Sequence, residues 1–239
     1  CADAADGLAA GNSFMDAELA LEDDLTPAER RRRKVRDAII GAAEAIFSEE
    51  GEAGLSMRRI AERIDYSPAA LYKYFDSKEA LFREIREQFF ERLLKRMQVA
   101  CAAIEQGPKL CTRCMRAYVE TGLEQPAHYK LAFAGICPEE EVEEGTFAFA
   151  AAEHLHAMIA ESMAAGWFRK VDLAKAANSV WSASHGLTML AVTLPEFPRE
   201  MPGRGDVSLD EMIDFHAEMV MRGLGADKLI DRMNAGDNF

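Results

Sequence analysis

Apolar residues recur at intervals of three and four along most of the chain, which predicts a protein built from α-helices. The first predicted helix begins after Thr26, because residues 26–29 (TPAE) match a capping box with proline at the first helical position. Ile39 and Ile46 continue one apolar face, and Gly51 is the expected end of this helix.

Two short helices follow directly. One is expected from Ser56 to about Ile64, and the other begins after Ser67, where serine at the N-cap and proline at the first helical position mark the start. Leu71 and Phe75 lie four residues apart and are expected to form the inward face of this second short helix. Three helices with a tight turn between the last two are typical of a helix-turn-helix module.

The rest of the pattern predicts a second, larger helical domain. Ser77 is the expected N-cap of a long helix that extends to Met97, while Asp172 and Ser208 are the expected caps of two later helices. The last of these is expected to end near residue 223, and no segment shows strand alternation. The expected fold is therefore all-α, with a disordered acidic tail over residues 1–25, a helix-turn-helix domain over 26–77 and a helical bundle over 78–239.

Charge is distributed unevenly along the chain. The net charge is −13 overall, but residues 30–78 carry +3, whereas residues 1–29 and 79–239 carry −8 each. A small basic module attached to an acidic body is typical of a protein that contacts DNA through one surface. The acidity elsewhere argues against an architectural protein that binds any DNA without regard to sequence.

The third predicted helix carries the strongest candidate chemistry. With Leu71 facing inward, helical geometry turns Ala69, Tyr72 and Lys73 outward. A small alanine lets a helix enter the major groove, lysine reaches base acceptors, and tyrosine hydroxyls can bind phosphates. A solvated face with partly covered aromatic rings is the alternative interpretation.

A run of basic residues, Arg30 to Lys34, lies in the first turns of the first helix, where the helix dipole is already positive. An external anion such as a phosphate backbone would make this placement favourable, and Arg58, Arg59 and Lys78 add cations near the starts of other helices. A solvated basic run, or neutralisation by the acidic tail, is the alternative.

Residues 54–85, GLSMRRIAERIDYSPAALYKYFDSKEALFREI, resemble the DNA-binding domain of TetR-family repressors. The resemblance includes the A-L-Y-x-Y-F-x-S-K-E-x-L pattern and covers roughly residues 30–85. It implies that phosphates are bound by Ser56, Ser67, Tyr72, Tyr74 and Lys78, and that bases are faced by Arg58, Ala69, Ala70 and Lys73. Together with two residues of the basic run, the predicted DNA-binding set is Arg32, Arg33, Ser56, Arg58, Ser67, Ala69, Ala70, Tyr72, Lys73, Tyr74 and Lys78.

The segment MAAGWFRKVDLAKAANSVWSASHGL is similar to the C-terminal domain of a TetR subgroup with a W-x-x-x-H-G element, here Trp181, His185 and Gly186. The resemblance implies a homodimer formed by the last two long helices. Small residues repeat every seven positions on one of them, so close helix approach is possible. The predicted dimer interface is Ala177, Ser184, Ala191, Met212, His216 and Met219; packing within one protomer is the alternative.

The larger domain contains a mixture of methionine and aromatic residues. In the TetR family such residues line a pocket for an apolar or amphipathic inducer, and methionine suits adaptable recognition. Each of them taken alone is more often plain core than a ligand contact. The predicted ligand-binding residues are Met115, Tyr118, Phe133, Met158, Trp181 and His185.

Cys111 and Cys114 form a C-x-x-C pair on a predicted helix, which raises the possibility of a redox or metal sensor. No second cysteine pair or suitably spaced histidines accompany it, so buried thiols are favoured and no metal site is expected. No cofactor is expected either, and the chain lacks a glycine-rich phosphate loop or a G-x-S-x-G elbow, which argues against an enzyme.

The sequence therefore predicts a dimeric transcriptional repressor that a small molecule releases from a palindromic operator in double-stranded DNA. A redox- or metal-responsive regulator acting through Cys111 and Cys114 is the alternative. No apolar run approaches the ~20 residues that span a bilayer, and the first residues lack the features of a signal peptide. We expect no membrane partner and a cytoplasmic location.

Overall fold

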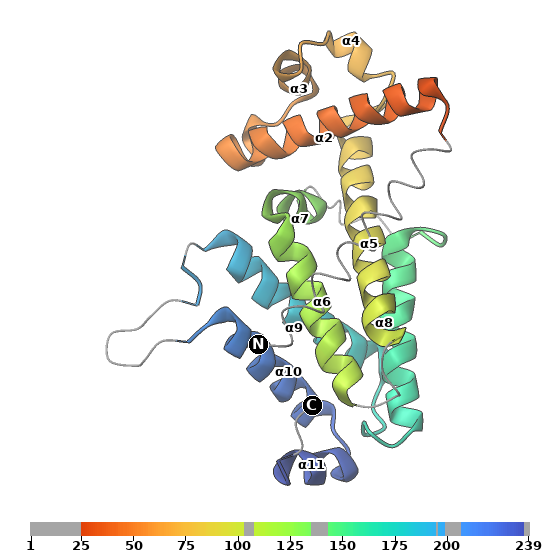
Figure 1. Ribbon diagram of the computed structural model, residues 1–239, viewed down its shortest axis with the longest axis vertical. Helices are drawn as coiled ribbons and strands as arrows, with labels where there is room; N and C mark the ends of the chain where they lie inside the picture. Colours follow the sequence, from red (N-terminus) through yellow and green to blue (C-terminus); the bar gives the residue numbers. More distant parts are fainter. Residues whose placement is uncertain (1–24, 103–107, 135–142, 195, 199–206, 237–239) are drawn as a thin grey trace. The chain divides into compact units, whose positions relative to one another are not determined.

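The computed structural model describes residues 25–102, 108–134, 143–194, 196–198 and 207–236 (Figure 1). Apart from Leu25, the predicted acidic tail lies outside the described residues. The described elements are α-helices, which confirms the all-α prediction. The chain divides into two compact units, residues 1–78 and residues 79–239, and each is described by itself.

The first unit contains α2 (Pro27–Gly54), α3 (Met57–Arg63) and α4 (Pro68–Leu71). Its start is the predicted capping box: the Glu29 amide donates to the Thr26 hydroxyl at 3.3 Å, and the Thr26 amide donates to the Glu29 carboxylate at 2.8 Å. Regular helix geometry is interrupted at Gly51, where φ is 69°, a conformation that glycine adopts without a steric penalty. The core of this unit is formed by apolar side chains that are almost fully buried, among them Ile39, Ile46, Ile60, Leu71 and Phe75.

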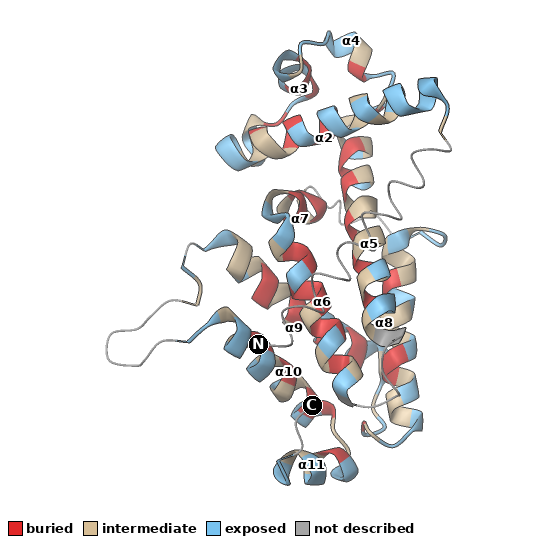
Figure 2. Cartoon of the chain, in the orientation of Figure 1, coloured by how far each residue is buried: buried red, intermediate tan, exposed pale blue. Residues whose placement is uncertain are grey.

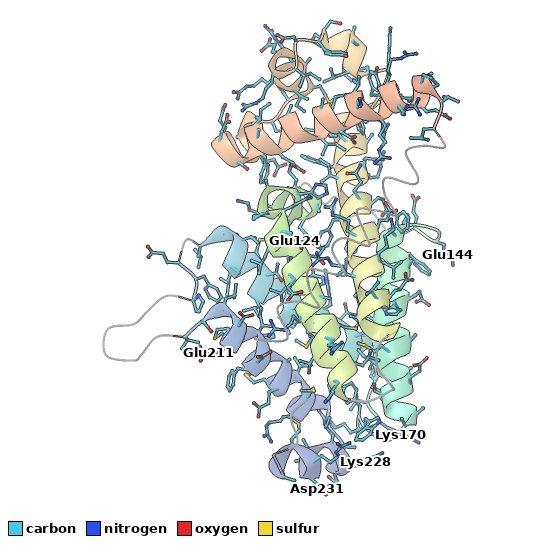
Figure 3. All side chains as sticks on the ribbon, in the orientation of Figure 1. Glu124, Glu144, Lys170, Glu211, Lys228 and Asp231 are labelled. Carbon is cyan, nitrogen blue, oxygen red and sulfur yellow. The ribbon has the colours of Figure 1, made fainter. Side chains whose placement is uncertain are left out.

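The second unit is a bundle of longer helices. They are α5 (Lys78–Ala102), whose first residue belongs to the first unit, α6 (Pro108–Glu124), α7 (Pro126–Phe133), α8 (Phe147–Ala164), α9 (Leu173–Thr193), α10 (Leu209–Leu224) and α11 (Asp227–Asn234). Asp172 and Ser208 cap α9 and α10 as predicted, and Glu211 completes a capping box with Ser208. Figure 3 labels Glu211 near the start of α10.

Helix α11 is an element that the sequence pattern does not predict. Its N-terminal residue has no side-chain cap, and it is only eight residues long. The Lys228 ammonium lies 3.7 Å from the centre of the Trp167 ring, and Leu229 is fully buried. Because such a short helix is unstable alone, these tertiary contacts hold it in place.

Helix α6 lies at the centre of the second unit and packs against α7, α9 and α10. Figure 2 shows buried positions along α6 and α9. The approach is closest at Gly122, where a Cβ atom would lie 2.4 Å from the Thr188 methyl group and 2.9 Å from the Tyr129 ring. Glycine at this position lets the α6 backbone come against α9. None of the described helices is long and apolar enough to cross a membrane.

Gly122→Ala is expected to lower the free energy of unfolding by about 1–3 kcal/mol, because the added methyl group would overlap both neighbours. Chemical denaturation followed by circular dichroism measures the change. The same substitution at Gly41 in α2 is the control, since a Cβ atom there meets nothing within 4 Å and alanine favours a helix. Unchanged stability of Gly122→Ala would contradict the close packing of α6 on α9.

Candidate functional site

The surface formed by α4 and the turn after it presents the polar side chains predicted to contact DNA. Leu71 and Phe75 are buried, while Ala69, Tyr72 and Lys73 are exposed. The helix itself ends at Leu71, and the next residues form turns in which the Tyr74 and Phe75 amides donate to the Leu71 carbonyl at 2.8 and 3.0 Å. The expected inward and outward faces are therefore kept, although the regular helix is shorter than predicted.

The predicted DNA-binding residues all have side chains at the surface. Four of them, Arg33, Ala70, Tyr74 and Lys78, are partly buried, and the exposed ones are Arg32, Ser56, Arg58, Ser67, Ala69, Tyr72 and Lys73. Ser56 and Ser67 also act as N-caps, accepting from the Arg59 and Ala70 amides at 3.3 and 3.2 Å. Each hydroxyl hydrogen therefore remains available for donation to a phosphate.

Arg36 anchors the segment after α4, a role that the sequence analysis does not predict. Its Nη1 donates to the Tyr74 carbonyl at 2.9 Å, and its guanidinium lies 4.3 Å from the centre of the Phe75 ring. The Arg32 guanidinium lies over the Tyr74 ring at 5.9 Å. The signal in the sequence is weak, because Arg36 follows a run of similar basic residues and only the fold distinguishes it.

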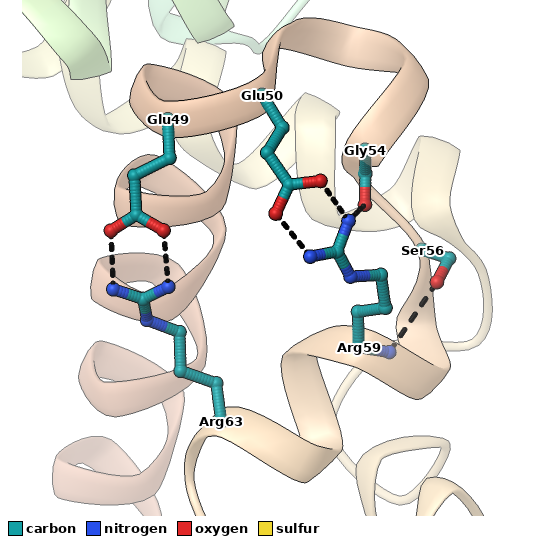
Figure 4. A network of polar contacts seen from close by, with 6 residues as sticks. All are labelled: Glu49, Glu50, Gly54, Ser56, Arg59 and Arg63. Carbon is teal, nitrogen blue, oxygen red and sulfur yellow. Dashed lines mark hydrogen bonds and ion pairs between the residues drawn. The ribbon is translucent and has the colours of Figure 1, made fainter.

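Two ion pairs fix α3 against α2 (Figure 4). Arg63 forms a bidentate pair with Glu49, at 2.8 and 2.6 Å, and Arg59 pairs with Glu50 and also donates to the Gly54 carbonyl at 3.1 Å. The arginine partners lower the pKa of both carboxyl groups. Arg59 is thus matched by a carboxylate, and Arg58, paired with Glu62, keeps an 80% exposed side chain.

The second unit contains a cavity of about 420 Å³ that is partly open to solvent. It is lined by residues of α5, α6, α8 and α9, by Phe133 of α7 and by the segment before α8. Most of the lining is apolar or aromatic. The fold brings five of the six predicted ligand-binding residues to this cavity: Met115, Tyr118, Phe133, Met158 and Trp181.

The sixth, His185, lies directly behind the cavity wall. Its Nδ1 is 3.2 Å from the Tyr118 hydroxyl and 2.7 Å from the Tyr129 hydroxyl, and the two hydroxyls are 3.3 Å apart. Burial lowers the pKa of His185, raises that of Tyr118 to about 12 and raises that of Tyr129. All three groups are therefore neutral at pH 7, and they form a hydrogen-bonded triad that fixes the wall.

The predicted dimer face on α9 is wrong in two positions. Ala177 and Ser184 are 1% and 3% exposed and line the cavity inside the protomer. Their small size allows close packing within one protomer, which is the alternative interpretation of this repeat, and leaves room for the cavity. Among the other predicted interface residues, Met219 is 56% exposed, while Ala191, Met212 and His216 are partly buried.

The two cysteines of the C-x-x-C pair are buried free thiols. Burial raises the pKa of the Cys111 thiol to about 12, so it stays protonated at neutral pH and is a poor nucleophile. Cys114 lines the cavity. Within the described ranges, no group of three or more His, Cys, Asp or Glu side chains is arranged to hold a metal ion.

A bundle of three helices with an outward Tyr-Lys surface, followed by a helical unit that contains a cavity, defines a two-domain helix-turn-helix protein. Two family models match these parts. Residues 39–85 match the model for bacterial regulatory proteins of the tetR family, and residues 111–216 match a Tetracyclin repressor-like C-terminal domain. Together they cover more than half of the chain, which belongs to the TetR family. The narrower resemblance through Trp181, His185 and Gly186 stays a prediction.

Individual relatives agree with this assignment. The HTH-type transcriptional repressor KstR of Rhodococcus jostii is 32% identical over 114 residues, which are 41% of this chain and 53% of KstR. The chain thus spans about half the length of that curated relative. Relatives of this kind are named as transcriptional regulators or repressors, in agreement with the prediction that the protein is not an enzyme.

Two solved structures illustrate the shared fold. A tetR-family regulatory protein from Rhodococcus RHA1 has a TM-score of 0.61 at 21% identity, covering 81% of this chain and 98% of its own. RolR in complex with resorcinol has a TM-score of 0.55 at 17% identity, covering 88% of this chain and 97% of its own.

Titration with a disulfide reagent at pH 8 is expected to show slow reaction of Cys111 in the native protein. Because burial raises its pKa to about 12, its thiolate fraction is on the order of 1,000-fold below that of an ordinary cysteine. Cys111→Ser is therefore expected to leave the number of fast-reacting thiols per chain unchanged. Loss of a fast phase in this variant would contradict the buried position.

Proposed function

We propose that the protein is a dimeric repressor that binds a palindromic operator and is released from it by a small, mainly apolar molecule. The observation that carries the DNA-binding part is the exposed surface of Ala69, Tyr72 and Lys73, fixed by the buried Leu71 and Phe75. Such a surface presents a base-contacting cation between groups that can bind phosphates. A DNA-binding role also places the protein in the cytoplasm, with the chromosome.

Selection of bound duplexes from a random pool tests this proposal directly. We expect enrichment of a palindrome whose half-sites lie one helical turn apart, ~34–36 Å, because a two-fold dimer places its two recognition segments at that repeat. Enrichment of no sequence, or of a site without dyad symmetry, would contradict it.

Lys73→Ala is expected to reduce discrimination between operator and random DNA by about 1–3 kcal/mol, because a base contact is lost.

Lys78→Ala is expected to weaken the complexes with operator and with random DNA alike. It should also lower the slope of log K against log salt by about 0.9, which corresponds to the loss of one phosphate contact. Fluorescence anisotropy at several salt concentrations measures both effects. Lys175→Ala, an exposed cation on α9, is the control and should change neither. An unchanged operator preference in Lys73→Ala would exclude its base-reading role.

The dimer is proposed to form through the outer faces of α9 and α10, which pack against each other within the protomer. On α10, Ile213, Ala217 and Met221 face the core, whereas Phe215 and Met219, on the opposite side, are 57% and 56% exposed. Leu190 on α9 is 45% exposed. A second copy of the chain would remove these apolar side chains from water, as the TetR resemblance implies.

Phe215→Glu combined with Met219→Glu is expected to weaken the dimer by about 50-fold or more, because it places two charges in an apolar interface. Sedimentation velocity over a concentration series measures the change. Val99→Glu, at a 50% exposed position on α5, is the matched control and should leave the dimer intact. A wild-type monomer at micromolar concentration, or an undisturbed dimer in the double variant, would contradict this interface.

The cavity supports the ligand-binding part of the proposal. An apolar cavity of this size within a helical bundle is a typical small-molecule site. RolR, a protein of this fold, has a solved structure in complex with resorcinol.

The cavity wall is also connected by ion pairs to the proposed dimer face. Arg116, next to Met115 of the cavity wall, donates to Asp210 at 2.7 Å and Asp214 at 2.5 Å on α10. A ligand that shifts α6 would therefore shift α10, and differential binding to two arrangements would release DNA.

A further inference from the structure

The cavity is elongated and has two different ends. Glu87 of α5 accepts from the Phe147 and Ala148 amides at the start of α8, at 2.6 and 3.4 Å. The start of α8 therefore lies beside Glu87. Met97 of α5 and Met158 of α8 line the cavity about ten residues further along. At 1.5 Å per residue, the charged and apolar ends lie ~15 Å apart.

The charged end is balanced in sign. It contains Arg83 and Arg86 together with Glu87 and Glu143. Arg86 donates to the Ala132 carbonyl at 3.3 Å, and Glu87 accepts from the two amides of α8. An ionised ligand group placed here would meet both signs of charge and would lose its hydration.

Three polar groups of the wall, on Ser184, Thr146 and His156, each donate a hydrogen to the protein itself. The Ser184 hydroxyl donates to the Val180 carbonyl at 3.0 Å, and the Thr146 hydroxyl donates to the Glu143 carbonyl at 2.7 Å. The His156 Nδ1 lies 2.8 Å from the Ala152 carbonyl, which accepts. A hydroxyl whose hydrogen is donated, and an imidazole protonated at Nδ1, retain only acceptor capacity for a ligand.

The size and apolar lining of the cavity limit the ligand further. A cavity of about 150 Å³ accommodates benzene, so about 420 Å³ has room for on the order of 15 non-hydrogen atoms. The rings of Phe90, Phe133 and Trp181 and the sulfurs of Met115 and Met158 line it. Aromatic rings and thioethers both make favourable contacts with an aromatic ligand.

We infer that the cavity selects neutral aromatic ligands that carry a hydroxyl group, and that the Ser184 oxygen accepts the ligand's hydrogen bond. This inference rests on the proposed ligand-binding function and makes it specific. A phenol or aromatic alcohol can donate a hydrogen to the Ser184 oxygen, whereas an ether has none to donate and a carboxylate would bring a charge into a mainly apolar cavity.

Three biphenyl probes of nearly equal size separate these properties: 4-phenylphenol, 4-methoxybiphenyl and biphenyl-4-carboxylate. Calorimetry on the full chain is expected to show that the phenol binds at least about fivefold more tightly than the other two, the worth of one hydrogen bond. Tightest binding of the carboxylate would overturn the inference in favour of an anion site at Arg83 and Arg86. Equal binding of phenol and ether, or no binding of any probe, would also overturn it.

Ser184→Ala is expected to remove the roughly fivefold preference for the phenol and to leave the affinity for the ether unchanged. Ser179→Ala is the matched control, because Ser179 lies on the same helix and makes the same type of hydrogen bond, to the Lys175 carbonyl at 2.7 Å, but is exposed and does not line the cavity. A preference that survives Ser184→Ala would overturn the assignment of this residue. Circular dichroism confirms that each variant is folded.

The same samples are assayed for binding to the selected operator with and without 4-phenylphenol. If the phenol binds as expected but leaves the DNA complex unchanged, the release mechanism fails and the ligand inference is supported. If operator binding is intact and no probe binds, the ligand inference fails and the DNA-binding function is supported. The two proposals can therefore fail independently.

Discussion

The proposed DNA-binding surface depends on the burial of two side chains beneath a helix that is too short to be stable alone. Helix α4 has only four residues, whereas isolated helices need about 12–15 residues even to be marginally stable in water. Leu71 and Phe75 fix the segment from below, and Arg36 binds the Tyr74 carbonyl and covers the Phe75 ring. Exposed ion pairs also join Glu49 and Glu50 of α2 to the neighbouring α3. The position of Lys73 is therefore a property of the whole first unit.

In the second unit, close packing and an open cavity exist side by side. Gly122 lets α6 approach α9 at one level, and the same two helices line the cavity at another, through Tyr118 and Ser184. The hydroxyls of Tyr118 and Tyr129 and the His185 Nδ1 satisfy one another, and these directional contacts stabilise the wall of the cavity. Apolar side chains alone would lack such directional contacts.

The differences between expectation and structure have a common cause. Periodicity correctly indicated the faces of α4, and the methionine and aromatic residues chosen for the larger domain lie around one cavity. The seven-residue repeat of small residues on α9 also marked a real packing face, but it could not distinguish a neighbour in the same chain from one in a second copy. Arg36 and Arg59 show the same limit, since equivalent charges along the sequence have different partners in the fold.

The sequence by itself determined the helical class, the capped starts of the helices, the outward and inward faces of the recognition segment and the basic character of residues 30–78, because these follow from local spacing and composition. The tertiary structure alone decided which arginines are matched by carboxylates, that Ala177 and Ser184 face inward, and that Ser184 lines a cavity. Those properties depend on contacts between residues far apart in the chain, and no local pattern records them.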